Sequence, residues 1–484
     1  MEKGEYTKAI ARLYGPEQAA EVMTSHLQTI YSGRLLQDMD DDRSLQYHST
    51  PFSQDTCPIL LDDVEDALRQ LPPKKAPRLP RLLRLQPITT DISPTELIRR
   101  INCLLYADDV VLIADKANMP TLFKSCEDHS YKLGYRWSPS KCIILDPTQL
   151  SPNYTLYDEP IPKQPSFPYL GIPFRPGGYI DAIALVNRNK AKALATMNQL
   201  SAIGVQPKGF SPLLGIRFYS HIVRAQLEYG LAITKVTTFL SKQLEDAQNV
   251  CLRRIFGGSH VSSTTAMLHM SKLPTMQERA YALQSQFLLR SLTLPEDALS
   301  LSLPFGENAP PNPESLDRRS LRPIQREYRQ DNLNKKRSTH ASVLLMHCRP
   351  TISLDPILWL PMSKSERSRC IRWRLGWLPG GQYKTCPRHP SQPFTKAHAV
   401  HCLQMHRKLM MPETISDPLS FLLNMLPTRK PRSPNTVRSW TIRWPTICRI
   451  LYELDYLFHA KLPPTPPTHL GQKLLEWLPS SPSH

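Results

Sequence analysis

Two adjacent aspartates stand in the middle of an apolar run, in the stretch "LLYADDVVLIA" at residues 104–114. The flanking Leu, Val and Ile residues are typical of a buried strand, where an uncompensated carboxylate is costly. Divalent cations such as Mg²⁺ or Mn²⁺ remove that cost, because hard cations prefer oxygen ligands. Two such ions about 3.5–4 Å apart can hold the attacking and leaving oxygens of a phosphoryl transfer. Asp108 and Asp109 are therefore candidate catalytic residues and Mg²⁺ ligands, and the alternative is a solvated hairpin turn.

A second group of residues with metal chemistry lies in "CPRHPSQPFTKAHAVHCLQMH", which begins at residue 386. Its first Cys and His are two residues apart on a proline-rich knuckle, and a later His and Cys are one helical turn apart, facing the same way. Two sulfur and two nitrogen donors suit tetrahedral Zn²⁺. The predicted ligands are Cys386, His389, His398 and Cys402. His401 and His406 are rival ligands, and the alternative is a histidine-rich surface helix with a lone thiol.

The composition favours a polyanionic partner. The 484 residues carry a net charge of +18, with a pI near 9.5. Nucleic acid is the simplest polyanion of this kind, and the alternative is a basic surface kept for solubility. No uncharged apolar stretch reaches the roughly 18 residues that span a bilayer, and the first residues lack a secretory signal. We therefore expect reduced cysteines, a nuclear or cytoplasmic location and no membrane partner.

Periodicity predicts the elements that would position these residues. Strands are expected at 101–114 and 141–147, with a helix between them that ends at Gly134. The stretch "YLGIPFRPGGYI" is predicted to be a hairpin with its turn at residues 176–178. Residues 183–300 are predicted to be helical, with one long helix closed by the glycines at 257 and 258.

The acidic stretch "LLYADDVVLIA" resembles motif C of the reverse transcriptases of non-LTR (LINE-like) retrotransposons. Other segments resemble the same family in the same order along the chain. "PILLDDVEDALRQLPPKKAPR" is similar to its fingers segment, "LGYRWSPSKCIIL" to motif D and "YLGIPF" to motif E. Residues 187–233 resemble its helical thumb, and the Cys/His stretch resembles its C-terminal knuckle, with His389 in place of a cysteine. The resemblance covers most of residues 20–300.

The resemblance implies an RNA-directed DNA polymerase that uses an RNA template and a DNA primer. Carried over by position, Asp108 would be the main Mg²⁺ ligand and Asp109 a weaker or more distant one. Tyr106 would lie beneath the primer end, and Lys141 would sit near the leaving pyrophosphate as a charge or proton donor. The basic fingers residues that would face the triphosphate or the template are Lys74 and Lys75.

The implied fold class is α+β: a partial polymerase palm with a small antiparallel sheet, a helical fingers remnant, a helical thumb and a mostly helical C-terminal region. The expected division is fingers and pre-palm at 1–90, a truncated palm at 91–182 and the thumb at 183–302. A basic, proline-rich linker would follow at 303–340, then a basic C-terminal region with the zinc knuckle at 341–465, and a disordered tail at 466–484.

Two parts of the family's active centre have no counterpart here. Only about thirty residues separate Lys75 from Tyr106, where the family places the motif A aspartate and the Gly/Gln-rich motif B. "RLPRLLRLQPITTDISPTELIRRIN" contains neither, and Asp91 is the nearest substitute. Small misplacements of reacting groups cost of order a hundredfold in rate. We therefore expect polymerisation to be impaired or absent, and the alternative is a catalytically dead protein that binds RNA or single-stranded DNA.

Arginine and tryptophan alternate in two C-terminal stretches, "CIRWRLGW" and "VRSWTIRWP". Arginines can meet phosphates while aromatic rings stack on unpaired bases, so Arg372 and Trp373 are candidate nucleic-acid-binding residues. The alternative is ordinary packing, with tryptophans in the core and arginines at its rim.

Overall fold

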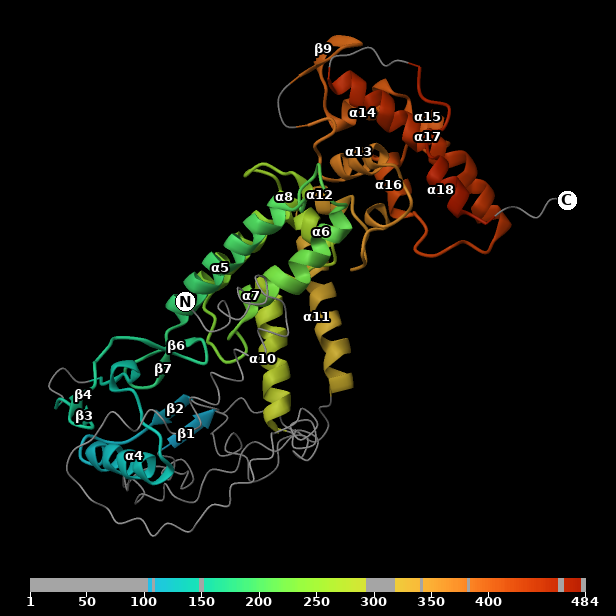
Figure 1. The fold of residues 1–484 in the computed structure, drawn as a ribbon. Helices are drawn as coiled ribbons and strands as arrows, with labels where there is room; N and C mark the ends of the chain where they lie inside the picture. The colour runs from blue at the N-terminus through green and yellow to red at the C-terminus, as the bar shows by residue number, and fades with distance from the viewer. Residues whose placement is uncertain are drawn as a thin grey trace, which may run out of the picture. The chain divides into compact units, whose positions relative to one another are not determined.

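The computed structural model describes residues 103–106, 109–147, 152–292, 318–339, 343–380, 384–459 and 465–479. All of them belong to one compact unit, Leu79–His484. This part of the chain is a mixture of helices and small antiparallel sheets, which agrees with the α+β class (Figure 1). The fingers region, Asp91 and the two lysines at 74 and 75 lie outside the described residues. Among the helices that the structure describes, none is long and apolar enough to cross a membrane.

The predicted strands at 101–114 form one hairpin, β1 (Cys103–Tyr106) and β2 (Asp109–Leu112), with Tyr106 opposite Asp109. Helix α4 (Met119–Leu133) follows and ends as predicted at Gly134, whose φ of 69° is the left-handed conformation that glycine adopts without strain. The second predicted strand, 141–147, is wrong. A short 3₁₀ helix (Pro139–Lys141) precedes an isolated bridge between Ile144 and Lys163, because the chain pairs there at one point only.

Short strands continue the sheet region. β3 (Thr155–Leu156) pairs with β4 (Glu159–Pro160), and β5 (Phe167–Tyr169), β6 (Ile172–Arg175) and β7 (Tyr179–Ile180) form a three-stranded antiparallel sheet. The predicted turn at 176–178 is confirmed, with both of its glycines at positive φ. A small apolar cluster of Phe123, Tyr154, Leu156 and Ile161 joins α4 to β3 and β4.

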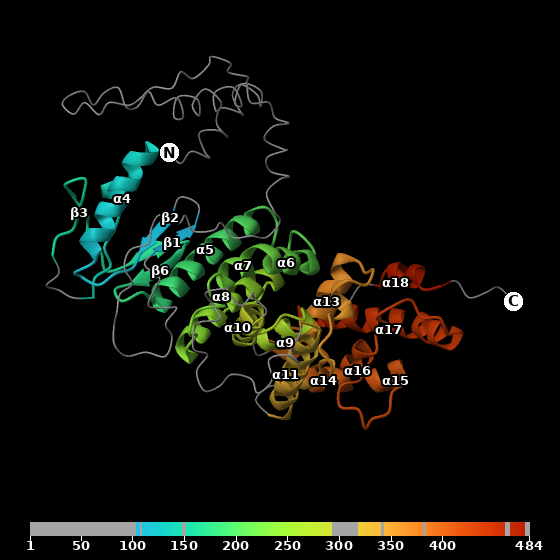
Figure 2. The same cartoon turned by 90° about the horizontal axis from the view of Figure 1, so that it is seen from below.

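The predicted helical segment from 183 to 300 is confirmed over the residues described. Its elements are α5 (Ala182–Ala202), α6 (Pro212–Phe218), a π-helical turn (Tyr219–Val223), α7 (Arg224–Glu228), α8 (Thr238–Phe256), α9 (Thr264–Met270) and α10 (Met276–Leu292). Helix α8 is capped by the Thr237 side chain and ends at Gly257, which has a φ of 82°. Figures 1 and 2 show from two sides how α5, α7 and α8 pack together, and Arg254 near the end of α8 donates to Asn198 near the end of α5.

The C-terminal part is helical apart from one hairpin. Its elements are α11 (Arg318–Ser338), α12 (Val343–Met346), a 3₁₀ turn (Pro356–Leu358), α13 (Lys364–Arg374), β8 (Thr385–Cys386), β9 (His389–Pro393), α14 (Lys396–Cys402), α15 (Met405–Leu409), α16 (Pro418–Asn424), α17 (Pro434–Phe458) and α18 (Gln472–Trp477).

Two expectations for this part are wrong. Residues 318–338, expected in a linker, form helix α11, because Leu333 is buried and Arg329 pairs with Glu278 of α10 at 3.3 Å. The tail expected to be disordered contains α18, whose Leu474 is fully buried. The backbone N–H of Gly471, just before α18, donates to the Glu366 carboxylate at 2.6 Å. These tertiary contacts outweigh the polar, proline-rich composition on which both expectations rested.

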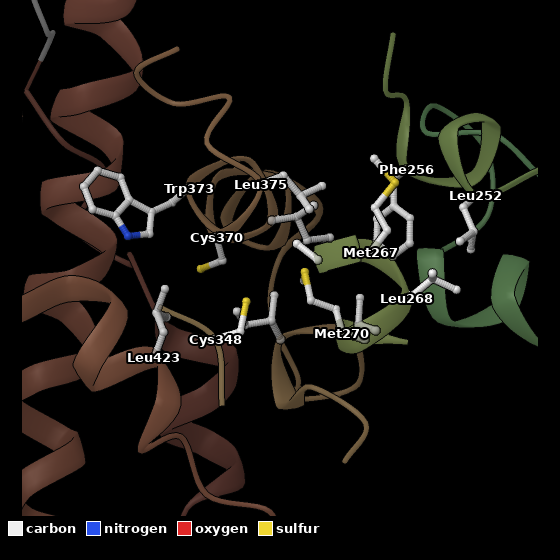
Figure 3. Close-up of a cluster of buried hydrophobic side chains, with 14 of the residues drawn as sticks. Leu252, Phe256, Met267, Leu268, Met270, Cys348, Cys370, Trp373, Leu375 and Leu423 are labelled. Atoms are coloured by element: carbon white, nitrogen blue, oxygen red, sulfur yellow. The ribbon is translucent and has the colours of Figure 1, made fainter. Parts of the chain in front are cut away.

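A single hydrophobic cluster extends through the helices from α5 to α18, so the expected thumb and C-terminal region share one core. Figure 3 shows the junction, where Leu252 and Phe256 of α8 and Met267 of α9 face Cys370 and Trp373 of α13 across Met270 and Cys348. The Met270 carbonyl also accepts a hydrogen bond from the Asp355 backbone N–H at 2.9 Å. The segment around α12 and residue 355 therefore joins the two helical groups.

Candidate functional site

The Cys/His group is assembled by a short hairpin and the helix that follows it (Figure 1). Cys386 of β8 lies opposite His389 of β9. Thr395 caps α14 by accepting a hydrogen bond from the His398 N–H at 3.1 Å. This cap begins the helix at the turn that brings His398 and Cys402 to one face, as their spacing predicted.

The four donor atoms lie within 4.8 Å of one another. The two sulfurs are 3.7 Å apart, Cys386 Sγ and His389 Nδ1 are 3.7 Å apart, and His389 Nδ1 and His398 Nε2 are 3.3 Å apart. A zinc tetrahedron with Zn–S of about 2.3 Å and Zn–N of about 2.0–2.1 Å has edges of about 3.8, 3.5 and 3.4 Å for these pairs. The donor set could therefore bind zinc with little movement of its side chains.

The pKa shifts of two of these side chains act in opposite directions on metal binding. Burial, with Cys386 as the next cause, raises the pKa of Cys402 to about 11, so a metal must displace the thiol proton before Cys402 can ligate. Burial, followed by the neighbouring histidines 389 and 401, lowers the pKa of His398, which favours the neutral imidazole that ligates metals. The rival His406 has its Nε2 2.9 Å from the Ile415 carbonyl, outside the donor cluster.

Charged contacts hold this centre against the rest of the fold. Lys396, at the start of α14, pairs with Asp417 at 2.7 Å and lies 4.4 Å from the centre of the Trp373 ring. Asp417 in turn caps α16 by accepting from the Ser420 N–H at 2.8 Å. On the hairpin side, Arg388 forms an ion pair with Glu453 of α17. The ligands are therefore fixed by neighbours on three helices, as metal ligands generally are.

The acidic hairpin is only partly described, because Asp108 lies outside the described residues. Asp109 is exposed, and Tyr106 opposite it is 61% exposed. The Asp109 charge acts on Tyr169 of β5: burial first, and then Asp109, raises the pKa of this tyrosine. Among the described residues the Cys386 group is the only one of three or more His, Cys, Asp or Glu that could hold a metal. Asp109 therefore belongs to no group of three such side chains among the described residues, from which Asp108 is missing.

Lys141 ends the 3₁₀ helix after α4 and is exposed. Its position permits contact with a ligand, but no described contact joins it to Asp109.

The prediction that Trp373 stacks on bases is wrong. The ring has no exposed surface, and its Nε1–H donates to Ser420 Oγ at 3.0 Å. Arg372 pairs with Asp455 at 2.8 Å and so serves the contact between α13 and α17. Trp440 and Trp444 are likewise buried. The alternative interpretation, tryptophans in the core with arginines at its rim, is confirmed for these residues.

Sequence reasoning missed a buried pair of opposite charges between α13 and the segment that precedes it. Arg374, with a side chain 1% exposed, lies 3.5 Å from Asp355 and donates to the His347 carbonyl at 2.8 Å. Its position four residues after the buried Cys370 was the available signal, since both lie on one face of α13.

Comparisons with protein-family models, with characterised proteins and with solved structures find no match for this chain. Its function must therefore be argued from the geometry described above.

Proposed function

We propose that this chain is a reverse-transcriptase-like protein of a non-LTR retrotransposon that has largely or wholly lost polymerisation. By descent it would be an RNA-directed DNA polymerase that uses Mg²⁺ or Mn²⁺. It would retain binding of RNA or single-stranded DNA, with a structural Zn²⁺ in its C-terminal region.

The observation that carries the proposal is the antiparallel β1–β2 hairpin, in which Asp109 begins the return strand opposite an exposed tyrosine. The resemblance to motif C predicts an acidic hairpin at β1–β2, near the hairpin that resembles motif E. The effect of Asp109 on Tyr169 of β5 supports that neighbourhood. Carboxylates so placed suit divalent cations and phosphoryl transfer.

The weakness of the expected activity follows from the ligand count. A two-metal centre needs carboxylates from more than one strand to fix both ions in reacting geometry. Asp109 is part of no group of three or more ligand residues within the described chain, and the segment between Lys75 and Tyr106 contains no counterpart of the motif A aspartate.

The zinc assignment rests on the near-tetrahedral spacing of the four donors. All four positions would be filled by protein atoms, which is the arrangement of structural rather than catalytic zinc. Zn²⁺ would then tie the β8–β9 hairpin to α14 and supply no chemistry to a substrate.

Primer extension on an RNA template, with Mg²⁺ or Mn²⁺, tests the polymerase part, with Asp108→Ala as the matched control. We expect no extension that depends on Asp108, together with salt-sensitive retention of the template. Robust extension that Asp108→Ala abolishes would overturn the loss of polymerisation. Failure to retain either RNA or single-stranded DNA at low salt would overturn the binding function.

A further inference from the structure

A small hollow lies where α9, α10, α11 and α12 meet, and Figures 1 and 2 show α10 and α11 side by side there. Its surface is mostly apolar, from residues such as Leu268, Leu333 and Leu345, and exposed cationic residues complete its lining. Three cationic side chains line it: Lys272 after α9, and Arg329 and Lys336 of α11. One carboxylate, Glu278 of α10, also lines it and pairs with Arg329 at 3.3 Å. Within the described residues neither lysine forms an ion pair, although the Lys336 charge acts on Glu245 of α8, so three cationic side chains face two carboxylates here.

The backbone at Lys272 is strained. Its φ of 58° is in the left-handed region, which glycine or asparagine usually occupies. The turn itself is fixed by backbone bonds, from Leu273 N–H to the Leu268 carbonyl at 3.0 Å and from Lys272 N–H to the His269 carbonyl at 3.1 Å. Glycine would satisfy those bonds without strain, so the turn does not require the lysine side chain. Five other described non-glycine residues also have a positive φ, and strain of this kind is one of the features found where a side chain serves a ligand.

Two exposed tyrosines lie beside the hollow. Tyr281 is three residues along α10 from Glu278, and Tyr328 precedes Arg329 on α11. Their ring centres are 6.4 Å apart in an edge-on arrangement, and the residues are 47% and 45% exposed. Aromatic faces next to cations are the combination that single-stranded nucleic acids recognise, with bases stacked and phosphates paired.

We propose that this hollow binds a backbone phosphate of single-stranded nucleic acid through Lys272 and Lys336, with an adjacent base on the Tyr281–Tyr328 pair. Arg329 also lines the hollow, but its charge is partly neutralised by the ion pair with Glu278. This inference rests on the proposed nucleic-acid binding and locates it on the seam between α10 and α11. An isolated inorganic anion would use the lysines without the tyrosines, whereas a strand would use both.

The full chain offers matched variants for the test. Lys336→Gln removes a charge from the hollow, and Lys335→Gln removes the same charge from an exposed neighbour that does not line it. Binding of a fluorescent 20-nucleotide oligouridylate is measured by anisotropy across a salt series. We expect Lys336→Gln to weaken binding about three- to tenfold and to reduce the salt slope by about 0.7, with little effect from Lys335→Gln.

Lys272→Gly separates a ligand contact from a structural role. It should weaken RNA binding to a similar degree while leaving the melting temperature unchanged or raised, because glycine relieves the left-handed strain. Equal losses of affinity in Lys336→Gln and Lys335→Gln, or unchanged affinity in Lys272→Gly, would refute phosphate binding at the hollow. Either result would leave the general nucleic-acid binding of the chain as proposed. A wild-type chain that does not bind the oligonucleotide at all would overturn both.

Discussion

Replacing Lys396 by methionine removes one charge from the first turn of the helix that carries His398 and Cys402, and keeps most of the apolar length of the side chain. The ammonium group lies 2.7 Å from Asp417 Oδ2 and 3.3 Å from Ser420 Oγ, over the Trp373 ring. The Asp417 side chain is only 6% exposed. Lys396→Met therefore leaves a carboxylate in the core without its cation.

The expected cost follows from that burial. At an effective dielectric of about 20, two charges 2.7 Å apart attract by about 6 kcal/mol before desolvation is subtracted. Removing one partner of a buried pair costs about 3–5 kcal/mol. Lys396 is itself 23% exposed, so we expect a value near the lower end, about 3 kcal/mol.

The assay is urea denaturation at pH 7 with a double-mutant cycle over Lys396→Met and Asp417→Asn. Lys408→Met is the matched control, because Lys408 pairs with Glu453 at 3.2 Å but is 40% exposed, and such pairs contribute about 1 kcal/mol or less. We also expect weaker zinc binding by Lys396→Met alone, since Lys396 begins the helix that carries His398 and Cys402.

The pH dependence of stability gives a second measure of the Lys396–Asp417 ion pair. Although burial alone would raise it, Lys396 and the hydrogen bonds from Ser420 hold the pKa of Asp417 below its ordinary value. A depressed carboxyl pKa contributes stability that is present above the unfolded pKa of about 3.9 and is lost as pH falls through the folded value. Lys396→Met should move that loss to higher pH. Equal effects of Lys396→Met and Lys408→Met, or strict additivity in the cycle, would refute the reasoning.

Three further outcomes are expected. Cys402→Ser should lose the bound zinc that mass spectrometry detects and expose the β8–β9 hairpin to proteases, whereas His406→Ala should keep both zinc and resistance. Burial lowers the pKa of His269 to about 4, so the folded state holds this side chain neutral and its protonation opposes folding. We expect the free energy of unfolding to fall by about 3 kcal/mol as pH drops from 6.5 to 4, and His269→Gln to remove most of that fall. Gly471→Ala should lower the melting temperature by placing a Cβ 2.7 Å from Trp444 at a φ of +82°, and an unchanged value would mean that the tail does not pack.

Local features were predictable where one residue decides the geometry. Gly134 and Gly257 end helices because glycine enters the left-handed region without cost. The proximity of the four Cys and His donors was predictable in part, because a spacing of four residues places His398 and Cys402 on one helical turn. The acidic hairpin was predictable from apolar residues on both sides of a polar pair.

Features that depend on partners far along the chain were not predictable in the same way. A tryptophan beside an arginine has the same local pattern on a surface as at the edge of a core, and Trp373 is buried because α16 and α14 cover it. Helix α11 resembles a linker in sequence because its composition is polar and basic, and only Leu333 among its described residues is buried. Its support comes from residues outside the helix: Glu278 of α10 binds Arg329, and backbone carbonyls between 345 and 349 accept from Arg337.

The bond between Glu366 and Gly471 spans 105 positions of the chain. During synthesis, Glu366 leaves the ribosome well before Gly471, whose N–H is its distant donor. Until then the Glu366 carboxylate can accept only local hydrogen bonds, such as the one from the Ser363 N–H. Contacts of such long range close late and slowly. The contact between α13 and the residue before α18 can therefore form only after Gly471 has left the ribosome, and we expect it to be among the last contacts made during folding.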